Sequence, residues 1–331
     1  TVWASISAGG SHSCGVSTTG AGVCWGWNGY GQTDEAMAAT FTTSSTAIAT
    51  RPAVAAVPTA TTTAVSTFTA TSGPIPRSTP STSFTPSPIA SMSLHRVSAG
   101  GYHSCGVSTS GVGVCWGKNS GNRTDVPSGT VWASISAGGS HSCGVSTSGA
   151  GVCWGWNGYG QTDVPSGTVW ASISPGGYHS CGVSTSGAGV CWGRNDYGQT
   201  DVPSGTVWAS ISAGGSHSCG VSTSGAGVCW GLNGYGQSEV LSGTVWASIS
   251  AGWYHSCGVS TSGAGVCWGD NYDGPTDVPS GTVWASISAG EWHSCGVLTS
   301  GVGVCWGWNY YGQTDVPSGT VWASISAGGS H

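Results

Sequence analysis

The chain has 331 residues, of which only 5% are charged, and its formal net charge is −6. Its single Lys is Lys118 and its five Arg are scattered, so no basic stripe can neutralise a run of phosphates, and we expect no nucleic-acid partner. No apolar run reaches the ~18 residues of a membrane helix and no secretory signal is found, so we expect no membrane span in this chain. Because Thr1 is not an initiator Met, we expect a mature chain or a fragment.

A 38-residue unit organises the chain. It is clearest at 130–167, as TVWASISAGGSHSCGVSTSGAGVCWGWNGYGQTDVPSG, and it recurs directly from Thr168, Thr206, Thr244 and Thr282. Units of this length stack side by side and bury their cores against each other. The repeat therefore predicts one repeat domain with an insertion.

Each unit predicts four short strands. In unit one, Val2–Ser7 and His12–Ser17 alternate and are rich in β-forming residues, and Gly22–Trp25 is a third run. A fourth strand is expected near Gln32, and Gly or Asn-Gly turns separate the runs. Four short strands per repeat are typical of a β-propeller blade.

The domain boundaries follow the repeat. Propeller unit one covers 1–34 and units two to seven cover 94–319, with Leu94 in place of the Trp of VWASI. The Ser/Thr/Pro-rich segment 35–93 lacks Cys and Trp and is predicted to be a disordered insertion, as either a flexible, O-glycosylated loop or a retained intron. Residues 320–331 repeat the start of the chain as a surplus first strand. Either the chain is cut inside a longer array, which the end at His331 favours, or this strand competes with the first to close the ring.

Fourteen Cys form pairs that are always ten positions apart. Folding the hairpin about Thr19 places Cys14 opposite Cys24, which permits a cross-strand disulfide with both hairpin faces buried. An even count locked to the repeat indicates an oxidising compartment, and hence an extracellular or cell-surface location. The sequon at Asn122 predicts glycosylation there. The predicted disulfides are Cys14–Cys24, Cys105–Cys115, Cys143–Cys153, Cys181–Cys191, Cys219–Cys229, Cys257–Cys267 and Cys295–Cys305.

Seven His recur two residues before the first Cys of each pair. Zinc sites use closely spaced Cys and His pairs, which this spacing lacks, so we expect no metal. We interpret the His as structural residues that hydrogen-bond to a loop backbone. No nucleophile or phosphate-loop motif occurs, and the Asp before each Val-Pro fits turn chemistry. We therefore expect no catalytic residue, no cofactor and no enzyme. The His are His12, His103, His141, His179, His217, His255 and His293.

The pattern SAGGxHSCGV followed by GVCWGxNxxGQ, seen at 136–145 and 151–161, resembles the repeat of the regulator of chromosome condensation family. It recurs in nearly every unit, with losses only at 120–123 and 274–275. The resemblance implies a propeller that is typically seven-bladed, so the expected fold class is all-β, a seven-bladed β-propeller with one four-stranded blade per repeat. The unit looks most like the secreted branch, which includes β-lactamase-inhibitory propellers and crinkly-type receptor kinase ectodomains. Those relatives bind proteins.

The units differ mainly before the His and after the CWG, and both loops are expected at one end of the propeller. The loops STSGAG and DVPSG at the other end hardly change. Exposed Trp and Tyr on rigid loops are typical interface anchors, so we predict a non-enzymatic module that binds a protein or glycan. The predicted patch comprises Trp253, Tyr254, Glu291, Trp292, Trp308, Tyr310 and Tyr311.

Two alternatives stay open. A structural cell-surface array without a dedicated ligand would vary at random exposed positions. The nuclear member of the family is an exchange factor for a small GTPase. No residue motif carries that activity over, and paired Cys argue against a nuclear location.

Overall fold

Short strands separated by glycine turns build the whole described chain. The computed structural model describes residues 9–34 and 94–329, and it contains 22 strands and no helix in these ranges. In the same ranges, nothing helical is long and apolar enough to cross a membrane. The expected strand Val2–Ser7 and the expected insertion 35–93 lie outside the described residues.

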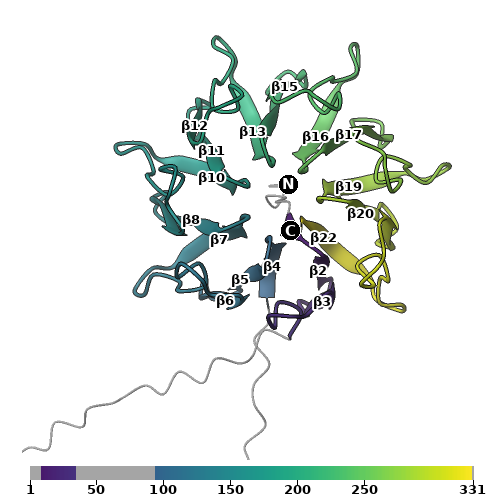
Figure 1. Ribbon diagram of the computed structural model, residues 1–331, viewed down its shortest axis with the longest axis horizontal. Helices are drawn as coiled ribbons and strands as arrows, with labels where there is room; N and C mark the ends of the chain where they lie inside the picture. Colours follow the sequence, from purple (N-terminus) through teal and green to yellow (C-terminus); the bar gives the residue numbers. More distant parts are fainter. Residues whose placement is uncertain (1–8, 35–93, 330–331) are drawn as a thin grey trace, which may run out of the picture. The chain divides into compact units, whose positions relative to one another are not determined.

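Seven sheets, antiparallel except for the short edge strand β1 (Gly9–Gly10), are arranged as blades around a central axis (Figure 1), which gives a seven-bladed β-propeller. The inner strands are β4 (Leu94–Ala99), β7 (Trp132–Ala137), β10 (Trp170–Pro175), β13 (Trp208–Ala213), β16 (Trp246–Ala251), β19 (Trp284–Ala289) and β22 (Trp322–Gly329). The middle strands are β2 (His12–Ser17), β5 (His103–Ser108), β8 (His141–Ser146), β11 (His179–Ser184), β14 (His217–Ser222), β17 (His255–Ser260) and β20 (His293–Leu298). The outer strands are β3 (Gly22–Gly26), β6 (Gly113–Gly117), β9 (Gly151–Gly155), β12 (Gly189–Gly193), β15 (Gly227–Gly231), β18 (Gly265–Gly269) and β21 (Gly303–Gly307). We number the blades one to seven in the order of their middle strands.

Blade one is assembled from segments far apart in the sequence. The strand β22 takes the inner place and pairs antiparallel with β2, with Cys14 opposite Ser326 (Figure 1). The two-residue strand β1 (Gly9–Gly10) adds to the other edge of β22 in parallel. The repeat at 320–331, expected to be surplus, therefore supplies the inner strand of blade one and closes the ring between blades seven and one.

The expected fourth strand near Gln32 is not formed. Residues 28–34 make a turn instead, in which Gly31 has a φ of 77°. The Gln32 carbonyl accepts hydrogen bonds from Ser104 Oγ and Trp116 Nε1 of the next blade, both at 3.0 Å. Because these two side chains satisfy the Gln32 carbonyl, this backbone group does not require pairing with a neighbouring strand. The prediction of four-stranded blades is therefore wrong for the described residues, where six sheets have three strands and the sheet of blade one gains β1.

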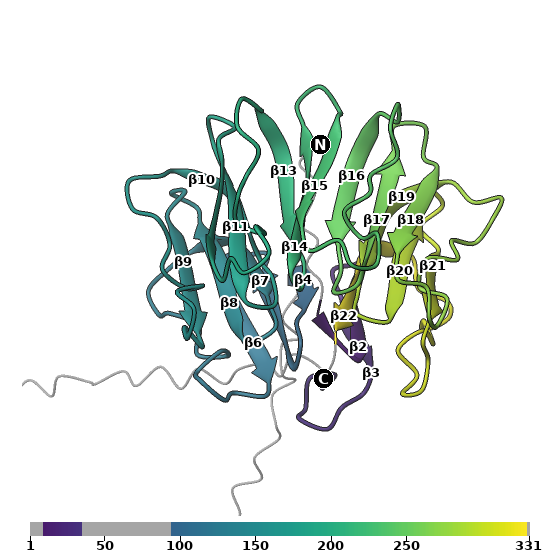
Figure 2. The same cartoon turned by 45° about the horizontal axis from the view of Figure 1, so that its top comes forward.

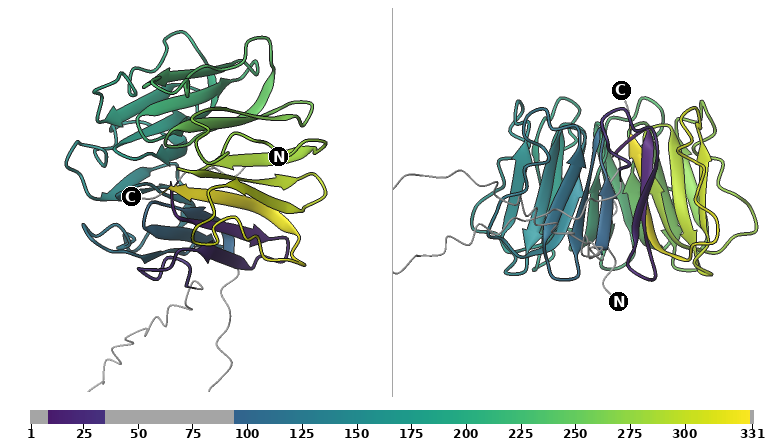
Figure 3. Two further views of the ribbon diagram at one scale, coloured as in Figure 1. Left: turned by 45° about the vertical axis from the view of Figure 1, so that its right-hand side comes forward. Right: turned by 90° about the horizontal axis from the view of Figure 1, so that it is seen from below.

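The hairpin register agrees with the sequence prediction. Cys14 lies opposite Cys24, and Trp25 lies opposite the small Ser13. The same register places all seven predicted disulfides within their blades. Both faces of each hairpin are covered, since the blades stack face to face around the ring (Figures 2 and 3).

Each interface between blades is a small apolar core. Between blades two and three, Cys105 and Val107 pack against Trp132, Ile135 and Trp154 of the following blade. The indole of Trp132 lies flat on its own sheet at Gly144, where an added Cβ would come within 2.6 Å of the ring. The repeated spacing of Trp and Gly in the units is thus a packing requirement, because only Gly leaves room for the indole.

Removing one disulfide is expected to cost stability without changing the fold. The double substitution Cys143→Ala with Cys153→Ala opens a short loop, for which chain entropy predicts a loss of roughly 2–3 kcal/mol. Denaturant unfolding of the variant and the wild type measures the difference. The exposed Thr147→Ala in the same hairpin serves as the control and should change stability by less than about 0.5 kcal/mol. A double variant as stable as this control would contradict the prediction.

Candidate functional site

Two kinds of loop meet at one end of the propeller. In blade three, Ser140 ends the loop between the inner and middle strands, and Trp156 follows the outer strand. The N–H of Trp156 donates to the carbonyl of Ser140 at 3.0 Å, and equivalent backbone bonds occur in the other blades. We call this end the aromatic end. The opposite end, with the turns between middle and outer strands, is the hairpin end.

Exposed aromatic side chains gather at the aromatic end. In the described part of the chain, every exposed large aromatic residue lies in a loop that follows an outer strand. Exposed Val side chains, such as Val131 and Val169, precede the inner strands at the hairpin end. The two ends therefore differ sharply in chemistry. The exposed aromatic residues are Tyr30, Trp156, Tyr159, Tyr197, Tyr235, Tyr272, Tyr310 and Tyr311.

Hydrogen bonds inside each loop hold these rings in place. In blade three, Asn157 Nδ2 donates to Asp163 Oδ1 at 2.8 Å, and Asn157 Oδ1 accepts from the N–H of Thr162 at 2.9 Å. The buried Gln161 accepts from the N–H of Tyr159 at 3.0 Å. The repeated Asp therefore serves the turn, as expected, and the aromatic residues stand on stiff loops. Stiff presentation lowers the entropy that a binding surface loses.

Three pairs of Tyr bridge alternate blade interfaces at this end. In each pair, one Tyr comes from the loop after an outer strand and the other precedes the His of the next blade. Their ring centroids are 5.7–5.9 Å apart, with interplanar angles of 80–85°. The pairs are Tyr30–Tyr102, Tyr159–Tyr178 and Tyr235–Tyr254.

Cations of the chain cover two of these pairs. Lys118 Nζ lies 4.5 Å from the ring centroid of Tyr30 and 4.6 Å from that of Tyr102. The guanidinium of Arg194 lies 5.0 and 5.5 Å from the rings of the second pair. Arg194 also forms an exposed ion pair with Asp196 at 2.6 Å. Cation–π contacts thus join neighbouring blades at the surface.

Two residues of the predicted patch are buried, so the expectation that they are exposed is wrong. Trp253 is 9% exposed and its ring lies 6.1 Å from that of Tyr178, two blades away. A Cβ added at Gly177 would lie 3.3 Å from Trp253 Cη2. Because blades four and six are not neighbours, the indole must extend past blade five, and it lies beside Gly139, Gly177 and Gly215 of blades three, four and five. It acts there as packing.

The second buried residue is Glu291, which is 3% exposed. It occupies the position of the second Gly in the GG pair, as does Trp253 in blade six. Burial raises the pKa of the Glu291 carboxyl to about 8, partly opposed by a hydrogen bond to Trp292. Its Oε2 has no hydrogen-bond partner. The sequence does not reveal that this position points away from the surface.

The remaining five predicted residues form two aromatic groups. Tyr254 and Trp292 lie 4.7 Å apart, and Tyr310 and Tyr311 lie 4.9 Å apart. The ring of Trp308 contacts the rings of Tyr310 and Tyr311. The backbone N–H of Trp308 donates to the Trp292 carbonyl at 2.9 Å, and this bond joins the two groups. The structure thus brings these five residues together at the aromatic end.

Sequence reasoning missed the wider extent of this surface. Rings of blades one to six and cations of blades two and four lie at the same end as the predicted patch. The signal was present, because a Tyr in NxYG of one unit precedes a Tyr before the His of the next unit. The two Tyr of a pair occupy different positions of two successive units, so a comparison of equivalent positions between units does not detect the pair. The residues missed from the patch are Trp27, Tyr30, Tyr102, Lys118, Trp156, Tyr159, Tyr178, Arg194, Tyr197, Tyr235 and Tyr272.

The predicted glycosylation site lies in a turn of blade two. Asn122 is exposed and has a φ of 63°, in the place that Gly160 takes in blade three. Arg123 replaces the repeated Gln and is buried, and its Nη1 donates to the carbonyl of Gly139 at 3.2 Å. The Asn122 side chain is therefore accessible, and its glycosylation stays a prediction.

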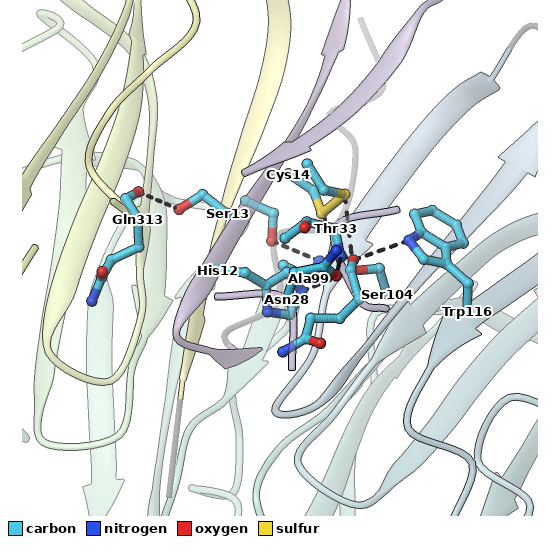
Figure 4. The surroundings of a disulfide bond; sticks show 12 residues. His12, Ser13, Cys14, Asn28, Thr33, Ala99, Ser104, Trp116 and Gln313 are labelled. Atoms are coloured by element: carbon cyan, nitrogen blue, oxygen red, sulfur yellow. Dashed lines mark hydrogen bonds between the residues drawn. A yellow bond between two sulfur atoms is a disulfide. The ribbon is translucent and has the colours of Figure 1, made fainter. Parts of the chain in front are cut away.

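The seven repeated His form a closed ring of contacts between blades, and Figure 4 shows one of these contacts, His12 with Ser104. Each Nε2 lies 2.7–2.9 Å from the Oγ of the Ser that follows the His of the next blade, from His12 with Ser104 round to His293 with Ser13. Each Ser Oγ donates to a backbone carbonyl at 2.8–3.0 Å, so the His must carry its proton on Nε2. The partner is a hydroxyl rather than the loop backbone that we expected. Within the described ranges, no group of three or more His, Cys, Asp or Glu is placed to hold a metal.

Comparisons with known proteins match this architecture. The pattern of the regulator of chromosome condensation (RCC1) repeat matches residues 3–32, 132–161, 170–199, 208–237, 246–274 and 284–313, which is more than half of the chain. No curated protein sequence matches the chain.

The chain is similar to many solved structures, among them two receptor ectodomains and one yeast protein. The entire ectodomain of receptor kinase CR4 from Physcomitrella patens has a TM-score of 0.64 and 24% identity, over 92% of this chain and 73% of that chain. The CRINKLY WD40 ectodomain of receptor kinase ACR4 from Arabidopsis thaliana has a TM-score of 0.55 and 26% identity, over 65% and 80%. Prp20p from Saccharomyces cerevisiae, described with its binding to Gsp1p and histones, has a TM-score of 0.61 and 17% identity, over 70% and 75%.

Proposed function

Because the chain belongs to the regulator of chromosome condensation (RCC1) repeat family, we propose that it is a non-enzymatic module that binds a protein partner through its aromatic end. The observation that carries the proposal is the segregation of exposed aromatic residues to one end of the ring. Aromatic side chains on rigid loops supply large contact areas at low entropic cost and dominate many interfaces. A structural array without a ligand gives no reason for this segregation.

An extracellular or cell-surface location accompanies the proposal. Seven disulfides favour an oxidising compartment, since reducing conditions in the cytosol and nucleus would open them. The Arabidopsis structure at 26% identity is a receptor ectodomain. A nuclear exchange factor for a small GTPase fits the disulfides poorly. A glycan ligand remains the alternative that the same rings would allow.

Removing two aromatic anchors is expected to abolish capture of the partner. Trp292→Ala with Tyr311→Ala changes one ring from each aromatic group, and neither ring contributes to a core between blades. The loss should be several kcal/mol of binding energy, about 2 kcal/mol or more for each anchor. The measurement is affinity capture from extracellular fluid, followed by titration of the captured protein against wild type and variant.

The matched control changes the hairpin end. Val169→Ala with Val207→Ala removes two exposed apolar side chains from the opposite end and should leave binding unchanged. Circular dichroism should show the same fold for both double variants. Equal binding by the aromatic variant, or equal loss in the hairpin variant, would refute the proposed face. Capture that is lost after the partner is deglycosylated would favour the glycan alternative.

A further inference from the structure

The three Tyr pairs at the aromatic end differ in one respect. The difference is the residue that follows CWG in the later blade of each pair. At the first two pairs this residue is Lys118 or Arg194, and its cation lies over both rings. At Tyr235–Tyr254 the equivalent residue is Asp270. In the described part of the chain, no cation covers this third pair.

We propose that the Tyr235–Tyr254 pair, with Asp270, binds a cationic side chain of a protein partner, in the place that Lys118 and Arg194 fill at the other two pairs. The ligand chemistry is an ammonium or guanidinium group, from Lys or Arg. This inference deepens the proposed binding function, because it lies on the same aromatic end and rests on that end being a binding surface.

Ring geometry supports the equivalence of the three pairs. The centroid distance of Tyr235 and Tyr254 is 5.7 Å at an interplanar angle of 82°, against 5.8 Å and 85° for the pair under Arg194. The backbone agrees as well, since the N–H of Asp270 donates to the Tyr254 carbonyl at 3.0 Å, as that of Arg194 donates to the Tyr178 carbonyl at 3.1 Å. The third pair therefore presents the arrangement that already holds a cation elsewhere in this chain.

Electrostatics at the third pair favour a cation from outside. The face of an aromatic ring carries negative electrostatic potential, and the Asp270 carboxylate adds negative charge near the Tyr235–Tyr254 pair. Among the residues that the structure describes, the Asp270 Oδ1 accepts a single hydrogen bond, from the backbone N–H of Tyr272 at 3.1 Å. Burial raises the pKa of Tyr254, and the nearby carboxyls of Glu291 and Asp270 raise it further. A basic side chain would gain a charge-assisted contact and two cation–π contacts together.

Access is open at this site. Tyr235 is 56% exposed, and Tyr254 and Asp270 are half-buried. Trp292 packs on Tyr254 at a centroid distance of 4.7 Å and extends the aromatic wall towards blade seven. A side chain from a docked protein can therefore reach the pair from solvent without displacing a core residue.

The test uses small cations on the intact protein. Nα-acetyl-arginine amide and Nα-acetyl-lysine amide are titrated into protein with ¹³C-labelled Tyr rings, and Nα-acetyl-citrulline amide serves as the neutral analogue. The ten Tyr give a resolvable set of ring signals, assigned by Tyr→Phe substitutions. We expect saturable shifts of Tyr235 and Tyr254 with the cationic probes, and binding of citrulline weaker by about ten-fold.

Two variants make the test specific. Asp270→Lys places the cation of blade two at the third pair and should abolish the shifts, while unperturbed Tyr30 and Tyr102 signals show that the fold is retained. Arg194→Asp removes the cation from the second pair and should create the same response at Tyr159 and Tyr178. Equal binding of citrulline, or shifts that persist in Asp270→Lys, would overturn the inference.

Failure of the cation site can be distinguished from failure of the proposed binding face. If the cationic probes fail at Tyr235 while the Trp292→Ala, Tyr311→Ala variant still loses its partner, only the cation site is wrong. If the probes bind and Asp270→Lys also weakens capture of the partner, the site is part of the interface. If the probes bind but Asp270→Lys leaves capture unchanged, its assignment to that partner is overturned.

Discussion

Acidification below about pH 6.5 is expected to unfold the propeller over a narrow pH range. Seven His are buried and neutral in the folded state, whereas the same His bind protons in the unfolded chain, so protons stabilise the unfolded state. Burial lowers the pKa of His12, His141, His179, His217 and His293 from 6.5 to about 3, and that of His255 to about 4. Burial, together with nearby positive groups led by Arg123, holds the pKa of His103 well below its usual range. These His are neutral in the folded state at any pH above these values.

The sign of the effect follows from the two states. Above about pH 6.5 the His are neutral in both states, and the stability is fully present. Between about pH 6.5 and pH 3 only the unfolded chain takes up the protons, so stability falls as the pH falls. Each His contributes at most about 1.4 kcal/mol per pH unit, and seven together approach 10 kcal/mol per unit. Domains are stable by only about 5–15 kcal/mol, so unfolding is expected between about pH 6 and pH 4.

Glu291 opposes this trend weakly. Its folded pKa is raised to about 8, so its stabilising contribution is present below the unfolded value of 4.5 and is lost as the pH rises through 8. Between about pH 4.5 and pH 6.5 it offsets the slope of one His. The net slope in that range therefore corresponds to about six groups.

Denaturant unfolding at a series of pH values measures this slope. The variant His179→Asn removes one titrating group, and the slope should decrease by about 1.4 kcal/mol per pH unit even where the variant is less stable overall. The exposed Thr147→Ala should leave the slope unchanged. A wild-type stability that stays constant from about pH 7 to pH 4.5 would show that these His can accept protons in the folded ring.

The sequence predicts the local parts of this fold well. Alternation predicts β2 with its observed bounds, and the spacing of the Cys predicts the register that places Cys14 opposite Cys24. Both features depend on residues within one unit. The fourth strand near Gln32 is wrong because its backbone partners, Ser104 and Trp116, belong to the next blade. Contacts between units do not leave a periodic signal inside a unit.

The candidate site shows the same limit. Variation between units correctly predicts aromatic groups such as Trp308 with Tyr310 and Tyr311. It does not show that the position shared by Trp253 and Glu291 is buried. Their neighbours in space come from blades that are distant in sequence, and the Tyr pairs that join adjacent blades were missed for this reason.

Replacing an inner-strand Trp is expected to destabilise the ring more than any surface change. Trp170 is 2% exposed and packs between Trp192 of its own blade, at a centroid distance of 5.5 Å, and the disulfide face formed by Cys143 and Val145. The indole of Trp170 is tightly packed in the wild type, since a Cβ added at Gly182 would lie 2.5 Å from it. Trp170→Ala therefore leaves a large cavity in this interface. The expected loss is about 3–5 kcal/mol. Because each blade is supported only by its neighbours, protection from hydrogen exchange should fall most in blades three and four.

The chain supplies its own matched control for this substitution. Blade two carries Leu94 at the equivalent position, where it is 2% exposed and keeps the same pairing, with Leu94 opposite Ser108. Trp170→Leu should therefore fold normally and lose roughly half as much stability as Trp170→Ala, since Leu fills part of the space. The core between blades one and two is correspondingly small, formed by Cys14, Val16, Val97 and Ala99. Hydrogen exchange in the wild type should accordingly be fastest, among the blade interfaces, at the interface beside β4. Equal losses for the Ala and Leu variants would contradict the prediction, because Leu would then restore none of the packing that the indole provides.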